Sequence, residues 1–85
     1  MTLMAKNLPV LRTKLDASQG DIADRLGVTR QTLSPFESGQ REMTWRVFLA
    51  LVLLFFRNPE TKMMLVAFEI YTPELDAFLA IPAKN

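Results

Sequence analysis

Apolar residues recur along the chain with the three- and four-residue spacing of amphipathic helices, and no stretch alternates as a β-strand would. Leu8 and Leu11 share one face and predict a first helix from about Leu8 to Asp16, with Pro9 tolerated in its first turn. Residues 1–7 are expected to form a loose N-terminal tail ahead of that helix.

A second helix is predicted from Ser18 onward. Ser18 and Asp21 match the capping-box pattern, in which the serine oxygen accepts a free amide at the helix start. Gly27 follows the last apolar position and is typical of a left-handed stop at a helix end. The buried face of this helix is expected to hold Ile22, Ala23 and Leu26.

The stretch from Thr29 to Gly39 predicts a short third helix, capped at its start by Thr29 and ended by Gly39. Leu33 and Phe36 lie on one face and are expected to be buried. Pro35 lacks the amide that a regular helix needs, so we expect the helix to kink or tighten around Ser34. The opposite face carries three polar side chains, namely Arg30, Gln31 and Ser34.

Three further helices follow. Thr44 caps a fourth helix over Trp45–Phe56, which is apolar nearly all round and should therefore be covered on more than one side. A fifth helix is predicted from Asn58 to Tyr71, and a short sixth from Thr72 until Pro82 closes it. The pattern predicts an all-α fold, a compact domain of five to six helices.

Composition narrows the function classes. The chain of 85 residues is 49% hydrophobic and contains neither cysteine nor histidine. The commonest general base, the commonest metal ligand and the thiol nucleophile are therefore missing, so no enzyme, cofactor or metal site is expected. The longest apolar run, Val47 to Phe56, is too short to span a bilayer, and no signal peptide is visible. We expect a cytoplasmic protein without a membrane partner.

Charge is distributed unevenly along the chain. Residues 1–46 carry seven basic and five acidic side chains, whereas residues 47–85 carry three basic and four acidic ones. The mild excess of positive charge in the first half agrees with a nucleic-acid-binding face there.

The second and third predicted helices are joined by a sharp turn, because Ala23 permits close packing and Gly27 permits the turn. Residues 8–56 closely resemble the lambda-repressor-like, Cro/cI-type helix-turn-helix regulators, also called the xenobiotic-response-element family. The resemblance rests on Leu11-Arg12, Ser18-Gln19, Ile22-Ala23, the run from Leu26 to Arg30, the run from Phe36 to Gly39, and Arg41.

The resemblance implies that Thr29, Arg30 and Gln31 begin a recognition helix that contacts DNA bases, with Ser34 one turn further on. Arg30 suits guanine and Gln31 suits adenine, although Arg30 on a phosphate remains open. The family also implies contacts to the DNA backbone, here from Gln19, Gln40, Arg41 and Arg46. Arg12 and Glu37 match its internal ion pair. Pro35 occupies a position where many members carry another contacting side chain, which predicts a narrower footprint.

Two functions remain open at this stage. The first is a sequence-specific, double-stranded DNA-binding transcriptional regulator, a small repressor that acts by promoter occlusion. The second is a protein-interaction module, such as an inhibitor, an antitoxin-like protein or a complex subunit, built on a borrowed helix-turn-helix. Residues 57–85 either cover the fourth helix or form a homodimer interface, and Met63 and Met64 suit a protein partner.

Overall fold

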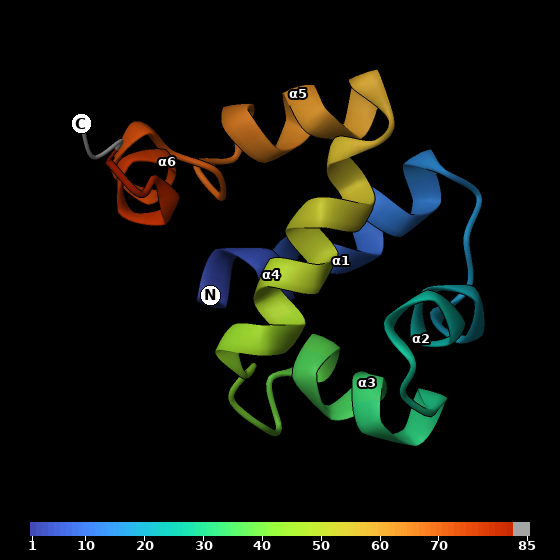
Figure 1. Ribbon diagram of the computed structural model, residues 1–85. Helices are drawn as coiled ribbons and strands as arrows, with labels where there is room; N and C mark the ends of the chain where they lie inside the picture. Colours follow the sequence, from blue (N-terminus) through green and yellow to red (C-terminus); the bar gives the residue numbers. More distant parts are fainter. Residues whose placement is uncertain (83–85) are drawn as a thin grey trace.

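The computed structural model describes residues 1–82, which form six α-helices and no strand (Figure 1). The predicted all-α fold is confirmed; the last three residues of the predicted C-terminal part, 83–85, lie outside the described range. The helices are α1 (Thr2–Lys14), α2 (Gln19–Leu26), α3 (Arg30–Ser38), α4 (Trp45–Phe56), α5 (Pro59–Ala67) and α6 (Pro73–Leu79).

Side chains cap the start of every helix after the first, as the sequence predicts. At α2 the capping box is complete, since Ser18 accepts from the Asp21 amide and Asp21 accepts from the Ser18 amide. Each of these caps satisfies an amide that the helix itself leaves free. The caps of the remaining helices are Thr29, Thr44, Asn58 and Thr72.

Glycine ends α2 and α3 in the left-handed conformation. Gly27 has φ 72° and Gly39 has φ 81°, values that side chains with a Cβ rarely adopt. The turn after α2 is closed because the Val28 amide donates to the Ala23 carbonyl. The short turn that follows fixes the direction in which α3 leaves α2.

The core gathers around α4, which buries Phe48, Leu51, Val52 and Phe55. Helices α2 and α5 both pack on α4, while α1 packs on α3 and α5. The prediction that α4 is covered on more than one side is therefore confirmed. Leu53, in the second half of α4, is not covered and is 71% exposed.

The prediction of a loose tail over residues 1–7 is wrong, because α1 begins at Thr2. Met4 is fully buried and extends the apolar face of Leu8 and Leu11 by one turn. Pro9 stands inside this helix rather than in its first turn, and its ring is exposed to solvent. The free energy gained by burying Met4 is larger than the free energy lost with the hydrogen bond that Pro9 removes.

Helix α5 ends at Ala67, four residues before the predicted end at Tyr71. Glu69 adopts φ 60°, and the amides of Ile70 and Tyr71 both donate to the Leu65 carbonyl. The chain therefore turns back on itself after α5. This turn buries Ile70, which is 6% exposed, in the core.

Helix α3 continues as an α-helix through Pro35 to Ser38, without a 3₁₀ turn. The predicted tightening around Ser34 is therefore wrong. Pro35 deprives only the Gln31 carbonyl of its donor, and Gln31 lies on the exposed side of the helix, where water reaches that oxygen. The end of α3 is held in addition by the Arg41 amide, which donates to the Pro35 carbonyl.

Candidate nucleic-acid interface

Helices α2 and α3 pack against each other across a three-residue turn, and both are anchored by buried residues. Ala23 is 1% exposed on α2, and Leu33 and Phe36 are buried on α3. One face of α3 is therefore fixed in the core. The other face is presented outward at one end of the molecule (Figure 1).

The outward face of α3 brings together three of the four residues predicted to contact bases. Arg30 and Gln31 are exposed, Ser34 is half-buried, and all three line one shallow hollow together with Pro35. Thr29, the fourth, stands at the helix start, where its hydroxyl oxygen accepts from the Thr32 amide. Its side chain is therefore engaged as a cap.

Gln19 and Arg30 meet at the junction of α2 and α3. The Arg30 Nε–H donates to Gln19 Oε1 over 3.4 Å, which is at the long end for a hydrogen bond. Both residues also line a second hollow with Arg12, Ser18 and Gly20 at the start of α2. The weak contact orients the Arg30 guanidinium while leaving it exposed.

Arg12 and Glu37 join α1 to the last turn of α3. The Arg12 Nε–H donates to Glu37 Oε2 over 3.0 Å and the Nη2–H donates to Oε1 over 2.7 Å, a two-pronged ion pair. Arg12 Nη1 also donates to the Ala17 carbonyl. The side chains are 18% and 9% exposed, so the pair is largely withdrawn from water. It ties α3 to α1 and to the loop before α2.

The remaining residues predicted to contact the DNA backbone lie between α3 and α4. Gln40, Arg41 and Arg46 are all exposed. The structure fixes the Arg41 backbone against α3 through its bond to Pro35. Among residues 1–82, no hydrogen bond or ion pair joins the side chains of Gln40 and Arg46 to α3.

Asp21 holds its charge at the start of α2. The amide of Ser18 donates to its carboxylate, and this bond, reinforced by the Ser18 hydroxyl contact, lowers the pKa of Asp21 below its usual range. Attraction to Arg25 acts in the same direction. The lowered pKa favours the charged carboxylate that completes the capping box.

Among residues 1–82 no group of three acidic side chains lies close enough to hold a metal ion. None of their helices combines the length and the apolarity needed to cross a membrane.

Pro35 is a further member of the outward face. It helps to line the hollow with Arg30, Gln31 and Ser34, at a position where the family resemblance implies a contacting side chain and where the sequence predicts a kink or tightening of the helix. Its position four residues after Gln31 places it on the same side of α3.

Comparison with known proteins agrees with this geometry. A family model described as a helix-turn-helix domain matches residues 4–55, which is more than half of the chain. The match starts at the buried Met4 of α1 and ends within α4. Neither the curated proteins nor the solved structures contain a significant match to the chain. Helix-turn-helix DNA-binding families are typically non-enzymatic. On the match over residues 4–55, the chain belongs to the helix-turn-helix domain family.

Proposed function

We propose that the chain is a sequence-specific, double-stranded DNA-binding transcriptional regulator of the Cro/cI type, a small repressor that occludes a promoter. The observation that carries the proposal is the outward face of α3, where Arg30, Gln31 and Ser34 adjoin one another while Leu33 and Phe36 are buried behind them. The major groove of DNA admits a helix presented in this way.

Base reading is assigned to the first turns of α3. Arg30 can form a two-pronged contact with guanine O6 and N7, and Gln31 can pair with adenine. The 3.4 Å contact to Gln19 is weak enough to be replaced or shared when Arg30 meets a base. Thr29 uses its hydroxyl as a cap, so its methyl group is the part left to meet a thymine methyl. Ser34 reaches a base or a phosphate one turn later.

Phosphate contacts are assigned to Gln19, Gln40, Arg41 and Arg46, which flank α3 on both sides. Such contacts position the protein without reading sequence, and each basic contact releases counterions. If Arg41 and Arg46 of both protomers of a dimer contact phosphate, about four charges are neutralised and the slope of log K against log salt is about −3.6.

Dimerisation is part of the proposal. Regulators of this class gain affinity by binding two half-sites about one helical turn apart, and operator symmetry then mirrors protein symmetry. Ten large apolar residues are at least 41% exposed in the described part of the chain, which supports a partner surface.

The test is selection of bound duplexes from a random DNA pool with the wild-type protein, Arg30→Ala and Lys6→Ala. Lys6 is exposed on α1 and lines neither hollow near α3, so it serves as the matched control. We expect a palindrome that is enriched by the wild type and by Lys6→Ala and lost with Arg30→Ala. Absence of enrichment by the folded wild-type protein, together with binding that ignores salt, would refute the proposal.

That refuting result would favour the second candidate, a protein-interaction module. The observation on its side is the apolar surface of the C-terminal helices, where Met63 is 72% and Val66 is 55% exposed. Methionine at an exposed apolar surface adapts to varied partners. This candidate predicts that Arg30→Ala and Lys6→Ala behave alike in every DNA-binding assay.

A further inference from the structure

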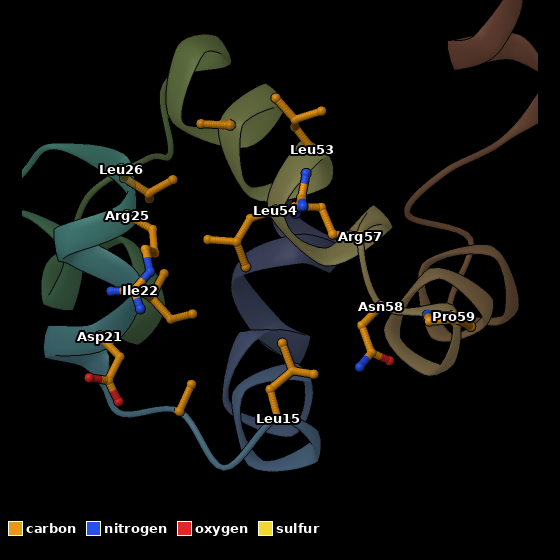
Figure 2. A pocket seen from close by; sticks show the side chains of 12 residues that line it. Leu15, Asp21, Ile22, Arg25, Leu26, Leu53, Leu54, Arg57, Asn58 and Pro59 are labelled. Atoms are coloured by element: carbon orange, nitrogen blue, oxygen red, sulfur yellow. The ribbon is translucent and has the colours of Figure 1, made fainter.

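An apolar groove lies on the molecule away from the outward face of α3. Its walls come from α2, the second half of α4 and the start of α5, and its floor includes Leu15, Ile22, Leu26 and Leu54. In Figure 2 Ile22 and Leu26 line one side, and Leu54 reaches toward them from the other. Three of these four side chains are only half-buried, so the groove is open to a second surface.

Two arginines stand at the rim of this groove, Arg25 on α2 and Arg57 at the end of α4. Both are exposed, and the ion pairs found within residues 1–82 involve neither of them. Asp21 attracts Arg25, but its carboxylate is already bound by the Ser18 amide. The groove therefore combines an apolar floor with a positively charged rim, which suits an acidic amphipathic helix.

Helix α6 has these properties. None of its residues is buried, and Phe78 is 75% exposed although it meets Trp45 edge-on. Ile81, three residues further on, is 88% exposed. Glu74 and Asp76 occupy the first turn, and no basic residue occurs from Pro73 to Pro82. The outer side of α6 is thus apolar and acidic.

Leu53 connects these two surfaces. This residue of α4 is 71% exposed and lines both the groove and a second apolar hollow that includes Leu79 of α6. Figure 1 shows α2 and α6 on opposite sides of α4. A continuous face therefore carries the acidic helix on one side of Leu53 and the basic-rimmed groove on the other. Such an arrangement is self-complementary under a two-fold rotation.

We propose that two copies of the chain associate through this face, with the two Leu53 side chains near the symmetry axis. The outer side of each α6 then docks in the groove between α2, α4 and α5 of the other copy. Glu74 of one protomer faces Arg25 and Arg57 of its partner, and Phe78 and Ile81 cover the apolar floor.

The accessible surface of the chain is large enough for an interface with a second copy. The accessible surface is 6056 Å², whereas a monomer of 9.7 kDa typically exposes about 5,100 Å². The excess of roughly 900 Å² is comparable to the roughly 800 Å² that each partner buries in a standard interface.

The proposed interface also suits the proposed function, on which this one step rests. Helix α3 lies at the end of the molecule where α4 begins (Figure 1). A two-fold axis that runs alongside α4 leaves both α3 helices at the same end of the dimer. One duplex can then meet both of them.

Sedimentation equilibrium without DNA tests the dimer, so its outcome does not depend on whether the chain binds DNA. Leu53→Asp places a charge at the centre of the interface and is expected to raise the dimer Kd by roughly 30-fold or more. Met63→Asp is the matched control, because Met63 is 72% exposed but lines neither the groove nor the hollow that includes Leu79. A wild-type protein that is monomeric at high concentration, or a dimer that only Met63→Asp weakens, would overturn the proposal.

A charge exchange tests the pairing of α6 with the groove. Glu74→Arg and Arg57→Glu alone are each expected to weaken the dimer several-fold, because each brings like charges together. The double variant restores an attractive pair and is expected to recover most of the affinity. Both changes are at exposed residues, and far-UV circular dichroism verifies that the three variants fold. A double variant no better than the single variants would show that α6 docks elsewhere.

Discussion

The ion pair between Arg12 and Glu37 allows the support of the recognition helix to be measured directly. Glu37→Ala removes both acceptors of the Arg12 guanidinium at once. Arg12 then keeps one bond, to the Ala17 carbonyl, and the solvent that reaches its 18% exposed side chain. The variant thus leaves a partly buried cation without its counter-charge.

The expected loss follows from that geometry. Breaking a fully buried ion pair costs about 3–5 kcal/mol, and the residual solvent access and the Ala17 bond reduce this to about 2–3 kcal/mol. A domain of this size has a total stability on the order of 4–13 kcal/mol. Glu37→Ala should therefore lower the melting temperature by roughly 10–20 °C. Glu37→Gln, which retains one acceptor, should lose about half as much free energy.

Urea unfolding followed by circular dichroism measures the loss, at one fixed protein concentration because a dimer would make stability depend on concentration. The matched control is Glu60→Ala, which breaks the Lys14–Glu60 pair. That pair is only slightly longer, at 2.9 Å against 2.7 Å, but its side chains are 49% and 65% exposed, so the expected loss is under about 0.5 kcal/mol. If Glu37→Ala cost no more than Glu60→Ala, the inference that Arg12 and Glu37 hold α3 in place would be refuted.

Three smaller predictions concern single residues. Gly27→Ala should lower the free energy of unfolding by about 1–2 kcal/mol, because φ is 72° there. Gly20→Ala should raise it by about 0.5–1 kcal/mol, since a Cβ at this position of α2 would make only ordinary contacts. Thermal melts measure both changes. Pro35→Ala should raise the unfolding free energy by about 1 kcal/mol or more, because it restores an amide inside α3. The bond from the Tyr71 hydroxyl to Asp76 raises the pKa of Tyr71 above the usual 10.0, so its support of α6 is complete below pH 10.0 and is lost as the pH rises through the folded-state pKa. A pH titration of near-UV circular dichroism checks this loss, and Tyr71→Phe should abolish it.

The helix starts could be predicted because their causes are local. Ser18, Thr29 and Thr44 each accept an amide three residues ahead, and a side chain at such spacing has the same use in any fold. The start of α1 carries no such signal, because Met1 provides no side-chain cap. Burial of Met4 by other helices decides that start, and this burial depends on contacts distant in the sequence.

The surfaces of the molecule were harder to predict than its helices. The polar face of α3 can be predicted from the spacing of polar and apolar residues within its nine positions. The groove exists only where α2, α4 and α5 meet, and no short stretch of sequence indicates that. The early end of α5 could not be predicted for the same reason. Glu69 adopts a positive φ although it is not glycine, and the burial of Ile70 compensates for this strained backbone. The sequence therefore predicts which residues share a face of one helix, but not which residues of three helices come together.

Pro35 illustrates how the structure retains one of two reasons for a prediction. The sequence predicts a narrower DNA footprint because proline should kink or tighten α3 and because it replaces a contacting side chain, and α3 remains an α-helix to Ser38. Its ring instead lines the hollow beside Arg30, Gln31 and Ser34, where it offers neither a donor nor an acceptor. If α3 contacts DNA bases as proposed, only residues of α3 before Pro35 can form sequence-specific hydrogen bonds. Pro35 itself can add only apolar contact with a thymine methyl group. Pro35→Gln should then extend the selected sequence at its edge without shifting its centre, since the residues before position 35 are unchanged.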